Sequence, residues 1–318
     1  MNALEDFLRP SQKQLFKQLA KKFKGKTLIS KVNFILVHGQ APVMLVAHLD
    51  TVHEQPVRDI CLSADKNILM SPQGIGGDDR CGVFALCKIF QSAQIKPWLL
   101  FCCNEEVGGL GAKKFCLAHQ QLQLPNELDN LKFLIELDRK GKNDAVYYRC
   151  ANLDFEKYIT GKGFKTAQGS FSDISLIAPE LGVAAVNLSC GYYAAHTRHE
   201  YINRSQLEHT IQKVVEITAE SIKIDFPKFE YIKALTQKHS LQKIIIHDEQ
   251  PISKSFFYKN QDDIPSPFSE EFIELYDTLL DFYSTDELES FRQVYGNQII
   301  KQLYREVIDS YYGYPMST

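Results

Sequence analysis

Residues 42–51 read PVMLVAHLDT, an apolar run that ends in a histidine and an aspartate. The run is short and apolar at consecutive positions, which is typical of a strand buried on both faces of a largely parallel sheet. Three more runs share this length and character, at residues 97–103, 131–137 and 182–188. The sequence therefore predicts a central sheet that contains these runs as strands.

Segments in which apolar residues recur at helical spacing precede, separate and follow the runs. They lie at residues 11–23, 78–91, 109–118 and 205–224, and Ser205 is the expected N-cap of the last one. Strands that alternate with helices indicate an α/β protein. The predicted fold is a three-layer α/β/α sandwich with a mixed, largely parallel central sheet.

Ionisable residues follow the runs at their carboxyl ends. In chain order the candidates are His48, Asp50, Glu105, Glu106, Asp138, His196 and Glu200, and Asp78 joins them from a glycine-rich loop that opens a helix. In an open α/β sheet, ligands bind outside the carboxyl ends of the strands. We therefore expect these side chains to converge along one edge of the sheet.

Several ionised carboxylates gathered in one cleft repel one another unless cations neutralise them. Nitrogen and carboxylate ligands without thiolates suit Zn²⁺, with Co²⁺ or Mn²⁺ as alternatives. In a two-metal site the ions lie ~3.5–4 Å apart. A further carboxylate that binds no metal can then act as a general base. The candidate residues therefore predict two divalent metal ions and hydrolytic chemistry.

Five motifs in this order resemble the co-catalytic di-zinc exopeptidases, the superfamily (peptidase clan MH) that holds peptidase T and the zinc aminopeptidases. They are HLDT at 48–51, GGDDR at 76–80, NEEVG at 104–108, ELD at 136–138 and HTRHE at 196–200. The resemblance implies the zinc exopeptidase fold. Around the last motif, GYYAAHTRHE at 191–200 is most similar to the tripeptide aminopeptidases of the clan.

The resemblance also implies roles for individual residues. The metal ligands would be His48, Asp78, Glu106, Asp138 and His196, with Asp78 bridging the two ions. Glu105 would be the general base that takes a proton from the attacking water and returns it to the leaving amine. Asp50 would hold the imidazole of His48 as a hydrogen-bonding carboxylate.

The residues themselves leave several of these roles open. Asp79 competes with its neighbour Asp78 for the bridging position. Glu105 and Glu106 could exchange the roles of base and ligand. Glu136 lies on the same strand face as the proposed ligand two residues later, so it is either a salt-bridge partner or a further ligand.

Other polar residues near the motifs have simpler expected roles. Arg80 either pairs with the neighbouring aspartate, which we expect, or meets a substrate carboxylate. Asp173 is expected to fix its loop, and His53 to be an ordinary polar residue. Tyr192 or Tyr193 could supply a donor to the oxyanion, because both lie close to the last motif.

The spacing of the motifs limits the domain organisation. Asp138 and His196 are 58 positions apart, which leaves no room for an inserted lid domain. Residues 226–318 hold 9 basic and 15 acidic residues and 17 of the 36 aromatic ones. We therefore predict a catalytic domain at 1–225 and an acidic, mostly helical extension at 226–318, which either packs on the domain or forms a surface for a partner or a homo-oligomer.

Composition excludes several other classes of protein. The 318 residues carry 36 basic and 39 acidic side chains, so we expect no nucleic-acid partner. No apolar run is long enough to span a membrane, and the N-terminus lacks the apolar core of a secretory signal. The 8 cysteines form no CxxC pair and lie mostly among apolar residues. This pattern predicts reduced thiols and a cytoplasmic location, although it leaves specialised export open.

The sequence thus predicts a metallopeptidase that acts on a small peptide or an acylated amino acid, with aminopeptidase activity as the first expectation. A carboxypeptidase or an N-acyl-amino-acid deacylase would use the same metal pair. A pocket for a free amine needs a spare acid such as Glu136, whereas a pocket for a carboxylate needs Arg80 or Arg198. A fold retired to binding alone would have lost a ligand or the base, and none is lost.

Overall fold

The computed structural model describes residues 3–31, 33–53 and 55–234, and within the rest of the chain only Leu279, Leu288, Arg292 and Ile300. Residues Met1–Lys233 form one compact unit. Apart from residues 226–234 and those four positions, the predicted helical extension and its proposed role in self-association lie outside the described residues. The predicted domain boundary at residue 225 stays a prediction.

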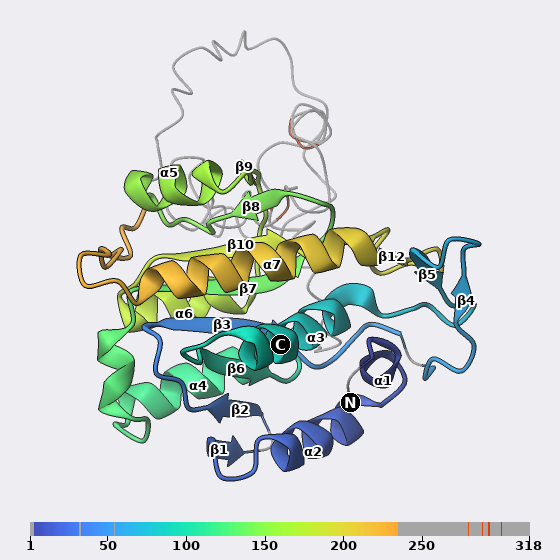
Figure 1. The fold of residues 1–318 in the computed structure, drawn as a ribbon, viewed down its shortest axis with the longest axis horizontal. Helices are drawn as coiled ribbons and strands as arrows, with labels where there is room; N and C mark the ends of the chain where they lie inside the picture. The colour runs from blue at the N-terminus through green and yellow to red at the C-terminus, as the bar shows by residue number, and fades with distance from the viewer. Residues whose placement is uncertain are drawn as a thin grey trace, which may run out of the picture. The chain divides into compact units, whose positions relative to one another are not determined.

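The central sheet has eight strands in the order β1-β2-β6-β3-β7-β10-β8-β9 (Figure 1). They are β1 (Thr27–Lys31), β2 (Phe34–Val37), β3 (Val43–His48), β6 (Trp98–Cys102), β7 (Phe133–Arg139), β8 (Asp144–Val146), β9 (Lys165–Thr166) and β10 (Ala185–Ser189). The central strands β6, β3, β7 and β10 are parallel neighbours, whereas β2 and β8 join them antiparallel. These four central strands are the predicted apolar runs, so the mixed, largely parallel sheet is confirmed.

Helices cover both faces of this sheet (Figure 1). They are α1 (Glu5–Leu8), α2 (Gln12–Lys22), α3 (Gly77–Ser92), α4 (Leu110–Gln120), α5 (Leu153–Gly161), α6 (Asp173–Leu181) and α7 (Arg204–Ser221), with a 3-10 helix at Asn126–Asn130. In β3, Val43 and Leu45 face a core that α3 and α7 complete, whereas Met44 and Val46 face a core completed by α4 and α6. The three-layer sandwich is therefore confirmed.

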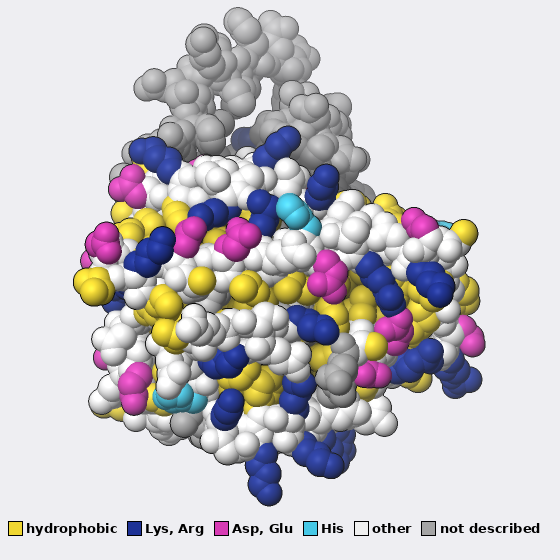
Figure 2. All heavy atoms as spheres, viewed as in Figure 1, with side chains coloured by type: hydrophobic (Ala, Val, Ile, Leu, Met, Phe, Trp, Pro, Cys, Tyr) yellow, Lys and Arg dark blue, Asp and Glu magenta, His cyan; other side chains and the backbone are white. Residues whose placement is uncertain are grey.

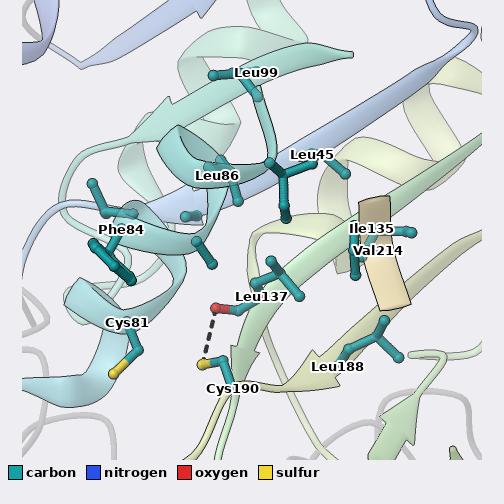
Figure 3. Close-up of a cluster of buried hydrophobic side chains, with 14 of the residues drawn as sticks. Leu45, Cys81, Phe84, Leu86, Leu99, Ile135, Leu137, Leu188, Cys190 and Val214 are labelled. Carbon is teal, nitrogen blue, oxygen red and sulfur yellow. Dashed lines mark hydrogen bonds between the residues drawn. The ribbon is translucent and has the colours of Figure 1, made fainter. Parts of the chain in front are cut away.

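The larger core lies between the sheet, α3 and α7. Leu45 of β3 and Ile135 of β7 meet Leu86 of α3 and Val214 of α7 there, all fully buried (Figure 3). At the edge of this cluster the thiol of Cys190 donates to the carbonyl oxygen of β7 residue Leu137, 3.3 Å away. All 8 cysteines are free and six are buried, as the sequence predicts.

Local hydrogen bonds set the ends of two helices. Ser11 forms a capping box with Gln14 at the start of α2. The predicted N-cap of α7 is wrong, because Asn203 occupies that position and its side chain accepts from the N–H of Gln206. Ser205 lies inside the helix, and its hydroxyl donates to Asn203 instead.

A second, antiparallel sheet of four short strands was not predicted. Its order is β11-β12-β5-β4, from β4 (Cys61–Leu62), β5 (Ile68–Met70), β11 (Tyr192–Tyr193) and β12 (Tyr201–Asn203). The loop between β11 and β12 carries the last motif, HTRHE. Because β12 pairs with β5, the small sheet fixes the loop that carries HTRHE beside the segment between β3 and α3.

The segment between the fourth and last motifs contains no lid. Residues 139–195 supply the end of β7 together with β8, β9, β10, β11, α5 and α6, so the expected absence of an inserted domain is confirmed.

Within the described residues, no helix combines the length and apolar character that a membrane span needs. Figure 2 shows basic and acidic side chains interspersed over the face that carries α7.

Phe229 packs in an aromatic cluster with Phe155 and Phe226, and its burial gives a stability prediction. Phe229 is 6% exposed, its ring centroid lies 5.0 Å from that of Phe155, and its N–H donates to the carbonyl of Lys132. We expect Phe229→Ala to lower the free energy of unfolding by about 3–5 kcal/mol, because it leaves a cavity. Urea denaturation would measure this. Phe171→Ala is the control, since Phe171 is 39% exposed; equal losses for both variants would contradict the prediction.

Candidate metal centre

The predicted site residues converge in three overlapping groups of histidines and carboxylates. Within each group, the ligand atoms lie within 4.8 Å of one another. The groups are His48 with Asp78 and Asp138, Asp78 with Glu106 and His196, and His48 with Glu105 and Glu106. The first two groups share Asp78. All five predicted metal ligands and the predicted base therefore lie in one cluster.

The topology of the sheet explains this convergence. His48 ends β3 and Asp138 lies near the end of β7, which is a parallel neighbour of β3. The loop after β6, on the other side of β3, carries Glu105 and Glu106. Because the three strands run in parallel, their carboxyl ends reach the same edge, as the sequence predicts.

His48 is held deep in the cluster, with no exposed surface. Its Nε2 atom lies 3.2 Å from Oδ1 of Asp78 and 3.5 Å from Oδ1 of Asp138. Its Nδ1 atom lies on the other side of the ring, 3.3 Å from Oδ1 of Asp50. The ring therefore presents Nε2 to the cluster while Asp50 fixes its orientation.

Asp50 also organises the two glutamates. Its Oδ1 accepts from the N–H of Glu105 and its Oδ2 from the N–H of Glu106, each at 3.0 Å. The same carboxylate thus positions an imidazole and the turn that carries two more site residues. The supporting role that the resemblance implied for Asp50 stays a prediction.

The neighbours Asp78 and Asp79 make different contacts. The two oxygens of Asp78 lie 3.2 Å from Nε2 of His48 and 3.2 Å from Nε2 of His196, respectively. Asp79 is fully buried, and its oxygens accept from the main-chain N–H groups of His48 and Gly82 at 3.1 and 2.9 Å. Asp78 therefore lies between the histidines, whereas Asp79 supports the backbone beneath them.

The second group is open to solvent at one end. The side chain of His196 is 49% exposed, and its Nε2 lies 3.2 Å from Oε2 of Glu106. Oε1 of Glu106 is buried and has no hydrogen-bond partner among the described residues. A buried carboxylate oxygen without a donor has free coordinating capacity, which a cation can use.

The neighbouring carboxylates raise the pKa of both histidines. Hydrogen bonds to Asp78 and Glu106 raise the pKa of His196 to about 11. Although burial lowers the pKa of His48, the surrounding carboxylates, Asp138 first among them, raise it well above its ordinary value. Both shifts show that the surrounding carboxylates favour a positive charge at these two positions, which divalent cations would supply on binding.

The carboxylates themselves are also perturbed. Burial and the neighbouring Asp78 raise the pKa of Asp138 to about 7. Burial likewise raises the pKa of Glu105 well above its ordinary value. Such crowding of acids is what a pair of divalent cations relieves, and the donor set of nitrogen and oxygen atoms without thiolates fits Zn²⁺.

Three expected side-chain roles change in the structure. The pairing of Arg80 with its neighbouring aspartate is wrong: Nη1 of Arg80 donates to the main-chain carbonyls of Phe7 and Pro10, at 3.0 and 2.9 Å. The hydroxyl of Tyr192 donates to Asp138. The hydroxyl of Tyr193 donates to Gln206. Neither tyrosine is thus placed as a free donor for an oxyanion.

Two more acids lie outside the three groups. Glu136 is fully buried and accepts a hydrogen bond from Ser172. Glu200, to which the sequence assigned no role beyond its place in the last motif, is also fully buried, and its contacts include His53. The four-residue spacing from His196 to Glu200 was the available signal for this residue. His53, expected to be an ordinary polar residue, is its partner.

Comparisons with known proteins identify solved structures that share this fold. No family model matches the sequence, and no curated protein matches it. Among solved structures, aminopeptidase PepT from Bacillus cereus is similar with a TM-score of 0.52 and 15% identity, over 69% of this chain and 97% of that one. An aminopeptidase from the archaeon Desulfurococcus kamchatkensis gives 0.53 and 13%, over 68% and 93%. A tripeptidase from Staphylococcus aureus gives 0.50 and 15%, over 69% and 97%. The chain therefore shares the fold of these two aminopeptidases and of the tripeptidase.

Proposed function

We propose that this protein is a two-metal hydrolase that cleaves an amide bond in a small peptide, with aminopeptidase activity as the first expectation. One observation carries the proposal: Asp78 places one oxygen against His48 and the other against His196. A carboxylate shared by two ligand sets is the arrangement that a pair of ions ~3.5–4 Å apart requires. The peptidase fold supports the same interpretation.

The two groups that share Asp78 would hold the two ions. His48, Asp78 and Asp138 would hold one, and Asp78, Glu106 and His196 the other. Zn²⁺ fits these donors best, with Co²⁺ or Mn²⁺ as alternatives. Divalent cations bound by these residues would supply Lewis-acid chemistry, which polarises a scissile carbonyl and lowers the pKa of a bound water.

The remaining steps fall to side chains of this protein. Glu105 belongs to neither of those two groups, and its Oε2 lies 3.9 Å from Nε2 of His48. Burial raises its pKa, which suits a base that takes a proton from water and returns it to the leaving amine. Asp50 keeps the ring of His48 oriented, and Tyr192 holds Asp138 through its hydroxyl.

The position of Arg80 bears on the substrate. Arg80 is 3% exposed and its Nη1 donates to two main-chain carbonyls, so its guanidinium is turned into the protein and away from a substrate carboxylate. Arg198 is exposed two residues after His196 and is the residue that keeps a carboxypeptidase or a deacylase as the second candidate. Glu136, the spare acid expected for an amine pocket, is buried. Aminopeptidase activity thus rests on the resemblance and the fold.

Metal analysis followed by a hydrolysis panel tests the proposal. We expect about two Zn²⁺ ions per chain, loss of activity with a chelator, and recovery with added Zn²⁺. The panel pairs each free-amine peptide with its N-acylated form, and we expect cleavage of the free-amine member. Cleavage of only the acylated members would instead assign a deacylase. A protein that binds no metal and cleaves nothing would be a binding module, contrary to the proposal.

A further inference from the structure

Glu200 is a fully buried carboxylate that lies next to the candidate metal centre but outside its three groups. Its Oε1 accepts from the N–H of Asp78 at 2.9 Å. Its Oε2 accepts from the N–H of Gly76 at 2.9 Å and lies 2.7 Å from Nε2 of His53. Burying a charge is costly unless donors surround it, and here three donors do.

These contacts join three segments that carry site residues. His53 lies in the loop after β3, which also carries Asp50. Gly76 is the N-cap residue of α3, and Asp78 lies in the first turn of that helix. Glu200 itself ends the turn that holds His196. A single carboxylate thus accepts from the backbone of Asp78 and from that of Gly76, two residues before it.

The loop that carries Asp78 is packed without spare room. A Cβ atom on Gly74 would lie 2.3 Å from the ring of His53, and one on Gly77 would lie 2.7 Å from Cβ of Tyr192. Such distances are too short for any side chain, so the backbone approaches its neighbours as closely as glycine permits. The position of Asp78 therefore depends on the contacts that Glu200 and His53 make.

We infer that Glu200, with His53 as its donor, is a positioning residue that holds Asp78 between the two ion sites and sets the affinity of the second site. The inference rests on the proposed function. His48 and Asp138, which with Asp78 form the first group, are anchored on β3 and β7. In the second group, Glu200 holds the backbone N–H of Asp78 and lies in the same turn as His196, and the side chain of His196 is half exposed. We therefore expect a substitution of Glu200 to weaken the affinity for the ion at the Asp78–Glu106–His196 group more than the affinity for the other ion.

Glu200→Gln tests the inference through metal affinity. Glutamine has the same shape, but its amide puts a donor where the wild-type oxygen accepts, so one N–H group loses its partner. We expect affinity for one of two Zn²⁺ ions to fall about 10–100-fold, with the other ion retained. The visible absorption of the Co²⁺-substituted protein should change in parallel, which a merely structural role would not predict.

A second pair of variants covers the case in which Glu200→Gln does not fold. His53→Gln keeps an N–H donor and should retain affinity for both ions, whereas His53→Leu removes the donor and should weaken the second ion by about tenfold. Glu180→Gln is the matched control. Glu180 accepts from His119 at 2.8 Å, in a histidine–glutamate pair that belongs to none of the metal-binding groups. We expect this control to bind both ions as the wild type does.

The outcomes separate the inference from the proposed function. Suppose that the wild type binds two ions and cleaves peptides, but Glu200→Gln and His53→Leu keep wild-type affinity and Co²⁺ absorption. The positioning role would then be wrong and the proposed function would stand. A wild-type protein that binds no divalent ion would overturn both.

Discussion

Replacing Glu105 by glutamine is expected to lower kcat by about 10²–10⁴-fold while both metal ions stay bound. Glutamine has the size of glutamate but takes no proton at neutral pH. Glu105 belongs to neither of the two groups that share Asp78, so its loss leaves both proposed ligand sets complete. Steady-state kinetics and metal analysis of the same preparation would measure the two effects separately.

Glu106→Gln is the informative partner of this variant, because the sequence leaves the roles of the two glutamates open. Oε2 of Glu106 lies 3.2 Å from Nε2 of His196, so this variant should lose an ion as well as activity. If Glu105→Gln loses the ion and Glu106→Gln keeps it, the two roles are exchanged. Unaltered turnover of Glu105→Gln would contradict the mechanism altogether.

The sequence was most informative where local pattern and global topology agree. The four apolar runs became β3, β6, β7 and β10 because strands buried on both faces need apolar side chains at consecutive positions. The parallel direction of these strands then brings their carboxyl ends to one edge. For that reason the sequence alone was enough to expect that residues far apart in the chain, such as His48 and Asp138, would meet.

The remaining features depend on partners that a local pattern does not contain. The three-residue strand β5 forms by pairing with β12, more than a hundred positions later, so neither has a recognisable signal of its own. Arg80 donates to main-chain carbonyls, which every residue offers and no sequence motif marks. Glu200 likewise accepts from main-chain N–H groups, so its role emerges only from the folded loops.

Asp78→Asn is expected to abolish binding of at least one of the two ions and to reduce activity by at least about 10³-fold. Each oxygen of Asp78 lies against a different histidine, and asparagine has only one oxygen to offer. The ion pair supplies several kcal/mol of transition-state stabilisation, and each 1.36 kcal/mol corresponds to about tenfold in rate. Isothermal titration with Zn²⁺ and the peptide panel would measure both losses.

Asp79→Asn is the matched variant that decides which aspartate bridges the ions. The oxygens of Asp79 accept from the N–H groups of His48 and Gly82, and asparagine can satisfy only one of these donors. We therefore expect a loss of about 1–3 kcal/mol in the free energy of unfolding, with both ions retained. A variant of Asp79 that loses an ion at wild-type stability would instead make Asp79 the bridge. Asp78 contacts the histidine rings and Asp79 contacts the backbone. The variant of Asp78 is therefore expected to lose metal binding, and the variant of Asp79 to lose stability.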